Sequence, residues 1–581
     1  MLLGAASLLL VLLVLAVAAT LPGVRSDLLA GKTALLTAQS DLGRGDVAGA
    51  RTQIRDAGRR AAHADGRTHD LVWRAMSHVP VARGAVRELQ AMSSALHVAT
   101  TQVVPPLLDL TDQPTWTGRV DAAPFRRLQG PLDRSTVLLE AARRRLRSAP
   151  HSDVSALATP RHQLDDGLTR LAVSVEDARV AATVVPELVT GDKRFLLAVQ
   201  NTAEPRATGG LLGAYGVLQV RNGALDLVRF GPNNDLRDSP SPVVDLGAEY
   251  DDRYASFDTT EAWRSANLTP DAPTAARILT ALWHRQFGEQ LDGVIFVDPV
   301  ALADLLGATG PVTLSDGTRI TSQNAVRVLL VEAYSRFSSR QDAERNSYLT
   351  ETARRVVRRL TQPGLHAERV VERVSQAASS GHLQVVATAP PVEEQLRQAR
   401  YGGALRADGP YLSVVTQDVG GSKLGAYLHR AITYTGTPTG EATDLGHGPE
   451  LEEDATVAVT LTNAAPTGLP AYVTARPDDP RAPVGQAKYW VSVYLGQDGT
   501  LLDATLDGRH LAVTSGTDEG LAVFSTFVTI DRGASRTLRL HVRQPARPGE
   551  PLTYRQQPLL RADELTVRRK GAPLVELYTR E

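Results

Sequence analysis

Residues 194–238 constrain the fold of this chain most, because they place strand patterns on both sides of a tight turn. The short apolar run Phe195–Val199 indicates a buried strand. Further along, two apolar runs flank Asn222-Gly223, the residue pair that best tolerates the positive φ angles of a type I′ hairpin turn. The stretch therefore predicts a strand, a polar loop, a glycine-rich strand, a hairpin and a second polar loop over Gly231–Asp238.

The glycines of this stretch have two interpretations. Gly210, Gly213 and Gly216 could cradle a phosphate, but a phosphate-binding loop of that kind leads into a helix. Here a strand pattern follows, so we predict that they allow close packing of backbone within a strand. The chain also contains no HExxH, EF-hand or GxSxG motif.

Composition excludes several classes of protein. The chain has 581 residues, enough for about three or four domains at common domain sizes. Its 63 Lys and Arg residues balance 64 Asp and Glu residues, so we expect no nucleic-acid partner. The absence of cysteine excludes disulfides, thiolate metal sites and cysteine nucleophiles.

The first residues predict membrane attachment. Leu2–Leu21 contains no charged side chain and is about as long as a helix that crosses a bilayer. A cleavable signal has a shorter apolar core and a basic start, and here no Lys or Arg precedes the segment. We predict a signal anchor over residues 1–24 with the bulk of the chain outside the cytoplasm, because long domains translocate largely regardless of charge. Cleavage near Ala18-Ala19 is the alternative.

Hydrophobic periodicity divides the remaining chain into three regions. Residues 25–185 repeat apolar positions every three or four residues, which indicates a helical juxtamembrane region. Residues 186–400 alternate strand and helix patterns, which indicates a mixed sheet flanked by helices. Residues 401–581 alternate with period two between Gly, Pro and Asp turns, which is typical of an all-β sandwich. The predicted fold class is therefore multidomain, with a transmembrane helix, a helical bundle, an α/β domain and a β-sandwich.

Several local signals predict where helices begin and end. Asp271 should cap a helix that Gly288 ends. Asp298 should cap another, with Pro299 at its first position, and Gly307 should close it. In the helical region, Asp46 should be the N-cap of a helix. The same region contains two arginine runs, Arg59-Arg60 and Arg143–Arg145. These runs are typical of solvated faces, with a contact to anionic lipid headgroups as the alternative.

The two predicted polar loops carry the candidate ligand-binding residues. Arg206 or Arg237 could hold a phosphate bidentately, and the neighbouring carboxylates could hold a hard cation such as Mg²⁺. The alternative is a buried polar network that fastens the two loops. The candidates are Asn201, Glu204, Arg206, Thr208, Asn233, Asn234, Asp235, Arg237 and Asp238.

A second anion contact is predicted further along the chain. Arg336, Arg340 and Arg345 lie close in sequence to Asp342. The alternative is a solvated basic loop.

Three segments of the chain resemble the bacterial domain-of-unknown-function family 4012. They are NTAEPRATGGLLGAYG (residues 201–216), WRSANLTPDAPTAA (Trp263 to Ala276) and the run from Asp292 to Val312. The resemblance extends from the predicted membrane segment to the C-terminal region. It implies no activity, because none is assigned to that family.

A weaker likeness is to the LytR–CpsA–Psr enzymes, which transfer polyprenyl-pyrophosphate-linked glycopolymers onto peptidoglycan outside the membrane. In that family a strand leads to an Arg-containing loop, a hairpin and a second polar loop. Arg206 resembles the arginine of the first loop, and Arg237-Asp238 resembles the Arg-Asp pair of the second. Asp342 and Arg345 resemble a later Asp/Arg pair.

Together these features predict a membrane-anchored extracytoplasmic protein of the cell envelope. We expect it to bind a glycopolymer or a polyprenyl-linked sugar phosphate through the cluster around Arg206. One alternative is an active phosphotransferase that attaches glycopolymers to the cell wall, for which Mg²⁺ would be the expected cofactor. Another is an envelope scaffold that binds a second protein.

Overall fold

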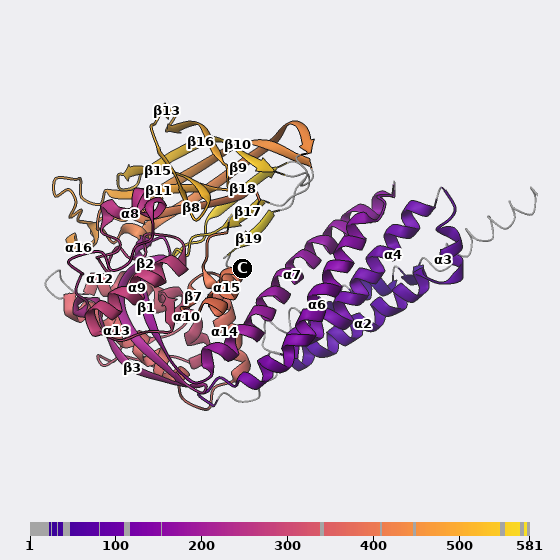
Figure 1. Cartoon of the computed structure of the whole chain (residues 1–581), viewed down its shortest axis with the longest axis horizontal. Helices are drawn as coiled ribbons and strands as arrows, with labels where there is room; N and C mark the ends of the chain where they lie inside the picture. The colour runs from indigo at the N-terminus through magenta and orange to yellow at the C-terminus, as the bar shows by residue number, and fades with distance from the viewer. Residues whose placement is uncertain are drawn as a thin grey trace, which may run out of the picture. The chain divides into compact units, whose positions relative to one another are not determined.

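The computed structural model describes residues 22–24, 26–31, 33–35, 37–38, 47–80, 82–109, 117–152, 154–336, 342–406, 409–444, 449–546, 552–569 and 574–577. The chain is multidomain, with a helical N-terminal region, a mixed sheet with helices and a C-terminal region largely of β-sheet (Figure 1). It separates into two compact units, Met1–Thr115 with Asp121–Glu187, and Trp116–Val120 with Leu188–Glu581.

The predicted signal anchor Leu2–Leu21 lies outside the described residues. Among the residues that are described, no helix has the length and hydropathy needed to cross a membrane. The anchor therefore stays a prediction from the sequence, as does the N-cap at Asp46, which also lies outside the described part.

The first unit is a bundle of helices. The repeating apolar positions of its first long helix, Ala50, Ile54, Ala57 and Ala61, are all buried. Arg59 and Arg60 lie on the same helix and pair with Asp56, as expected of a solvated face. The helices are α2 (Val47–Thr68), α3 (Leu71–Met76), α4 (Arg83–Val98), α5 (Val104–Asp109), α6 (Ala122–Ser148) and α7 (Ser155–Val189).

A buried ion pair connects three of these helices. Arg161 of α7 lies 3.2 Å from Glu88 of α4, and neither side chain is more than 7% exposed. The same guanidinium donates to the carbonyl oxygens of Leu146 and Ala149 at the end of α6. Because a helix leaves its last carbonyls without partners, Arg161 both caps α6 and holds it against its neighbours.

The second unit begins with a five-stranded sheet in the order β3-β2-β1-β4-β7. β1 runs parallel to β4, and the other neighbouring pairs are antiparallel. The predicted hairpin turn is confirmed, since Asn222 and Gly223 have φ angles of 45° and 84°. The strands are β1 (Asp192–Arg206), β2 (Gly209–Arg221), β3 (Ala224–Pro232), β4 (Gly293–Val297) and β7 (Leu383–Ala387).

The predicted polar loop after the first strand is wrong. β1 continues to Arg206, and the chain turns at Ala207-Thr208 directly into β2. The pairing with β2 skips from Asn201 to Pro205, so the residues between them form a bulge. A bulge inserts unpaired residues into a strand. Glu204 lies in this bulge, which explains how polar side chains interrupt a buried strand.

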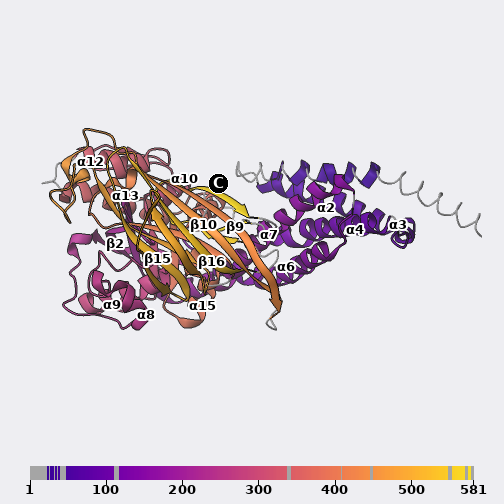
Figure 2. The same ribbon diagram turned by 90° about the horizontal axis from the view of Figure 1, so that it is seen from above.

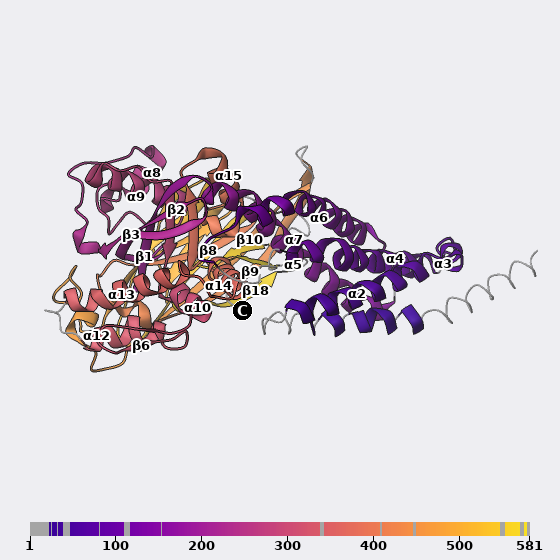
Figure 3. The same cartoon turned by 90° about the horizontal axis from the view of Figure 1, so that it is seen from below.

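Helices cover both faces of this sheet (Figure 3). On one face lie α8 (Ala248–Tyr254) and α9 (Ala272–Phe287). On the other lie α10 (Pro299–Thr309), α13 (Asp342–Leu360) and α14 (Ala367–Ser379).

The predicted helix boundaries are confirmed at three of four positions. Asp271 and Asp298 accept hydrogen bonds from backbone amides as N-caps, and Gly288 ends α9 in the left-handed region. Gly307 does not end α10, which continues to Thr309 with Gly310 as its C-cap. Gly307 instead lies inside the helix and faces α14, since a Cβ atom there would lie 3.0 Å from the guanidinium of Arg373.

The C-terminal region consists largely of two six-stranded sheets, in the orders β13-β12-β16-β10-β9-β18 and β14-β15-β11-β8-β17-β19. Apolar side chains from both sheets share one core, and β9, β10, β15 and β16 lie along a similar axis, with β10 antiparallel to β9 and β16 (Figure 2). The strands are β8 (Tyr411–Asp418), β9 (Leu428–Asp444), β10 (Pro449–Asn463), β11 (Ala487–Leu495), β12 (Thr500–Leu506), β13 (Arg509–His510), β14 (Thr514–Asp518), β15 (Leu521–Ile530), β16 (Ser535–Ala546), β17 (Leu552–Arg555), β18 (Glu564–Arg569) and β19 (Leu574–Leu577).

The core of the C-terminal sheets extends into the α/β region. Ala203 of β1 and Leu330 and Tyr334 from the following helices belong to the same buried cluster as Leu424 and Val473. Burying apolar surface is the main favourable contribution to folding. The predicted domains 186–400 and 401–581 are therefore joined by shared core, and both lie within one compact unit.

A buried polar network makes a second connection between these regions. Arg253 of α8 stacks 4.7 Å from the ring centroid of Trp490 and donates to the hydroxyl of Tyr494. Tyr254 and Tyr494 both donate to Asp518 at the end of β14. Burial raises the pKa of Asp518 to about 6, although the charge of Arg253 and the two phenol donors oppose that rise.

Candidate functional site

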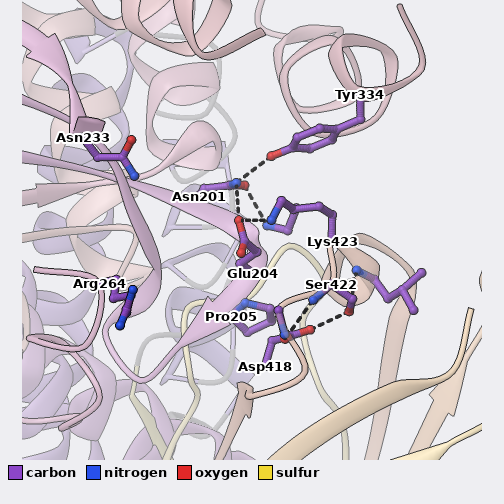
Figure 4. Close-up of polar contacts among 12 residues, drawn as sticks. Asn201, Glu204, Pro205, Asn233, Arg264, Tyr334, Asp418, Ser422 and Lys423 are labelled. Atoms are coloured by element: carbon purple, nitrogen blue, oxygen red, sulfur yellow. Dashed lines mark hydrogen bonds and ion pairs between the residues drawn. The ribbon is translucent and has the colours of Figure 1, made fainter. Parts of the chain in front are cut away.

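The bulge of β1 packs against the connection between β8 and β9, where an ion pair joins the two. Glu204 Oε1 lies 2.7 Å from Lys423 Nζ, and both side chains are only 9% exposed (Figure 4). The same ammonium lies 4.8 Å from the ring centroid of Tyr472, a favourable cation–π position. Glu204 is thus already neutralised by a cation from a distant part of the chain.

Asn201 holds the bulge in shape. Its side-chain amide donates to the hydroxyl of Tyr334 at 2.6 Å, as Figure 4 shows, and its carbonyl oxygen accepts from the backbone amide of Ala203. Asn201 is 8% exposed. A buried amide must satisfy its polar atoms, so this residue has a structural task.

Asp418 organises the other side of the contact. Its carboxylate accepts from the backbone amide of Gly421 at 2.7 Å and from the hydroxyl of Ser422 at 2.7 Å (Figure 4). Burial raises the pKa of Asp418 to about 6, while Ser422 and Arg206 act in the opposite direction. Asp418 therefore shapes the turn that places Lys423 beside Glu204.

Arg206 is half-buried and is held mainly by backbone carbonyls. Its Nη1 donates to the carbonyl oxygens of Asp418 at 2.5 Å and Pro205 at 3.1 Å. Its Nε lies 3.5 Å from the carbonyl oxygen of Arg264. No hydrogen-bond partner for Nη2 and no carboxylate in ion-pair contact occurs among the described residues. Arg206 is thus fixed in position without a direct ion pair in the described part of the chain, although Glu204 and Asp418 interact with its charge.

A second guanidinium group lies close to Arg206. Burial lowers the pKa of Arg206, the positive charge of Arg264 lowers it further, and Glu204 and Asp418 act in the opposite direction. Arg264 is exposed and forms no ion pair in the part of the chain that the structure describes. Arg206 and Arg264 form a candidate anion site, because neither has a carboxylate in ion-pair contact among the described residues.

Thr208 belongs to a separate buried network. Its hydroxyl accepts from Gln200 at 2.6 Å and from Asn267 at 2.9 Å. Asn267 also donates to the carbonyl of Gly210. Because Thr208 is 1% exposed, it fastens the turn between β1 and β2 and cannot contact a ligand from solvent.

The second polar region, residues 231–238, is held against β2 by the side chains of Asn233 and Asp235. Asn233 donates to the carbonyl of Leu212, and its own side-chain carbonyl is buried without a hydrogen-bond partner among the described residues. The carboxylate of Asp235 lies 3.5 Å from the hydroxyl of Tyr215. Asn234 is exposed, and no contact of its side chain is observed in the described part of the chain.

Arg237 and Asp238 lie beside the segment that carries Arg264. The indole of Trp263 donates to the carbonyl of Arg237, and the amide of Trp263 donates to the carboxylate of Asp238. Both Arg237 and Asp238 are exposed. Trp263 and Arg264 therefore connect the two regions that the sequence predicts as polar loops. Trp263 contacts Arg237 and Asp238, and Arg206 contacts the carbonyl oxygen of Arg264.

The predicted second anion contact is described only in part. Asp342 and Arg345 lie on α13, but their side chains, like all of Arg340, lie outside the described residues. Arg336 is described, and its guanidinium contacts Asp316 at 2.9 Å and the hydroxyl of Tyr348.

Sequence reasoning missed Lys423, Tyr334 and Arg264. Arg264 lies inside one of the three segments that carry the family resemblance, so it could have been included. Lys423 and Tyr334 had no local signal, because each contacts the bulge only after the chain has folded. In the part of the chain that the structure describes, no group of three or more His, Asp or Glu side chains is placed to hold a metal ion.

Comparison with known families accounts for part of this site. Residues 190–334 match the family described as "Protein of unknown function (DUF4012)". This segment is a DUF4012 domain. It contains Arg206 and Arg264, and its last residue is Tyr334, the partner of Asn201. Lys423 and Asp418 lie beyond it, so the polar cluster is shared between the DUF4012 domain and the C-terminal sheets.

The other comparisons add no relative. No curated protein and no solved structure matches the chain. The LytR–CpsA–Psr likeness of the DUF4012 domain therefore stays a prediction.

Proposed function

We propose that this protein is a membrane-anchored, extracytoplasmic protein of the cell envelope. Its DUF4012 domain binds the phosphate of a glycopolymer or of a lipid-linked sugar phosphate. The observation that supports this proposal is the pair Arg206 and Arg264, two neighbouring guanidinium groups without a carboxylate partner among the described residues.

The arrangement of Arg206 suits a phosphate contact. Its Nη1 and Nε face backbone carbonyls, which fix the plane of the guanidinium before a ligand arrives. Positioning a group in advance lowers the entropy cost of binding. A phosphate that contacts both arginines would also remove the repulsion between Arg206 and Arg264, so binding is favoured on two counts.

Binding is better supported than catalysis. Glu204, the carboxylate nearest to Arg206 in the sequence, forms an ion pair with Lys423. The carboxylate of Asp418 accepts hydrogen bonds from Gly421 and Ser422 in the turn that follows it. Neither is open to act as a general base on a bound substrate. The proposal includes a LytR–CpsA–Psr-like fold for the α/β region and a β-sandwich for the C-terminal region. Phosphotransfer onto the cell wall is the alternative function.

The test measures binding of inorganic pyrophosphate, and of polyprenyl pyrophosphate in detergent, to the full chain by calorimetry. We expect Arg264→Gln and Arg206→Lys each to weaken binding about tenfold or more, since a charge-assisted hydrogen bond contributes about 1.5–3 kcal/mol. Arg285→Gln is the matched control, because Arg285 is an exposed arginine of α9 outside the cluster. If Arg264→Gln binds like the parent, the proposed site is wrong. If the parent binds neither probe, the scaffold alternative is favoured.

A further inference from the structure

The first unit exposes apolar and basic side chains at the end where α3 lies. We call this the α3 end and define it by the described residues of the α2–α4 connection (69–80 and 82), those of the α6–α7 connection (149–152 and 154) and residues 22–24. In Figure 1, Figure 2 and Figure 3, α3 lies at one extremity of the bundle. We propose that the α3 end rests on the surface of an anionic phospholipid bilayer. The inference depends on the membrane anchor in the proposed function, and not on its ligand.

The start of the described chain packs against the α3 end. Val24 is 1% exposed and shares a small core with Trp73 and Met76 of α3. Asp27 lies 3.4 Å from Arg67 in the last turn of α2.

The direction of this N-terminal segment follows from a second contact. Ala38 is buried with Ala50, near the start of α2, whereas Val24 lies near the end of that helix. The segment therefore runs antiparallel to α2, and its earlier residues point toward the α3 end.

The length of chain before Val24 identifies what faces this end. The uncharged run Leu2–Leu21 ends three residues before Val24. Three residues of extended chain span at most about 11 Å. If that run crosses a bilayer, the α3 end must lie within the headgroup region or directly above it.

The α3 end exposes apolar side chains that a bilayer interface would bury. Leu71, the first residue of α3, is 80% exposed, the largest value among the exposed large apolar side chains of the described chain. Val154, in the α6–α7 connection, is 46% exposed, and its carbonyl accepts from Leu157, which packs on the same small core. Leucine at an interface lies at the boundary between headgroups and acyl chains.

Exposed basic side chains also lie at the α3 end, without a carboxylate in ion-pair contact among the described residues. Arg74 donates to the carbonyl of His69, and Arg145 from the end of α6 lies 3.4 Å from the His69 ring. Arg83, at the start of α4, is exposed. None of the three forms an ion pair in the described part of the chain, so their charges are available to lipid phosphates.

The chain has no cysteine, so single labels can be placed without background. Leu71→Cys would carry an environment-sensitive fluorophore in the full chain, reconstituted in vesicles of phosphatidylcholine and phosphatidylglycerol with a spin-labelled lipid quencher. Val137→Cys is the matched control, since Val137 is 65% exposed on α6, about 16 Å along the helix from its end. We expect quenching at position 71 to be several-fold stronger than at position 137.

The charge contribution is tested in the same assay. Replacing Arg74, Arg83 and Arg145 together with glutamine, or using phosphatidylcholine alone, should reduce quenching at position 71 toward the control. Equal quenching at positions 71 and 137, or a chain that does not float with the vesicles, would overturn the inference. Loss of pyrophosphate binding with this quenching intact would contradict only the proposed ligand.

Discussion

Replacing Lys423 with methionine should strongly destabilise the unit that contains the DUF4012 domain. The substitution keeps most of the apolar stem but removes the cation that lies 2.7 Å from Glu204. Glu204 would then remain as a buried carboxylate without a charged partner, and breaking a buried pair in this way costs about 3–5 kcal/mol. The cation–π contact with Tyr472 would also be lost.

A double-mutant cycle separates the pair from its parts. Glu204→Gln together with Lys423→Met removes both charges, and such a replacement is often nearly neutral. The double variant should therefore be clearly more stable than Lys423→Met alone. Lys488→Met is the matched control, because Lys488 also faces an aspartate, Asp478 at 3.1 Å, but is 33% exposed. An exposed pair contributes about 1 kcal/mol or less.

The assay is urea unfolding of the full chain, followed by tryptophan fluorescence. The protein has more than one compact unit, so unfolding need not be two-state and a single free energy of unfolding is not defined. The midpoints of the unfolding transitions are therefore compared between variants. If Lys423→Met shifts the midpoint no more than Lys488→Met, the ion pair is not a structural fastener. If the losses in the double variant simply add, Glu204 and Lys423 are not coupled.

Two further predictions follow from the same unit. The pKa of Asp518 is about 6 in the folded protein and about 4 in the unfolded chain, so ionisation of this carboxyl opposes folding. Its contribution to the free energy of unfolding, about 3 kcal/mol, is fully present below pH 4 and is lost as the pH rises through 6. Asp518→Asn should therefore reduce the fall in urea midpoint between pH 4 and pH 7, and an unchanged fall would contradict the assignment. Gly210→Ala should destabilise by about 1–3 kcal/mol, because a Cβ there would overlap the backbone carbonyl of Asn201. Gly213→Ala should lower the melting temperature less than Gly210→Ala does, because its Cβ would meet only the side chain of Leu349, at 3.2 Å. Equal losses of melting temperature would refute this reasoning.

Much of the local structure was predictable because its causes are local. The turn at Asn222-Gly223 depends on which residues tolerate positive φ, and the caps at Asp271 and Asp298 depend on a side chain three residues or fewer from the amide it accepts. The predicted end of α10 at Gly307 is wrong, because this glycine lies inside the helix, facing Arg373 of α14.

The candidate site was predictable only in outline. Asn201, Glu204 and Arg206 were recognisable as polar residues beside a buried strand. Their roles depend on Tyr334, Lys423 and Arg264, and no periodicity or spacing connects these residues to the bulge. The alternative of a fastened polar network describes most of the cluster, and ligand binding by Arg206 and Arg264 stays a proposal.

The sequence by itself determined the apolar N-terminal run, the helical region, the hairpin and the β-rich C-terminal region, because composition and periodicity act within a few turns or strands. Only the tertiary structure decided that β1 continues through its polar residues as a bulge. It also decided that the core of the C-terminal sheets includes Ala203 and Tyr334. These outcomes depend on burial and charge pairing between segments far apart in the chain, since a buried Glu204 is tolerable only where Lys423 reaches it.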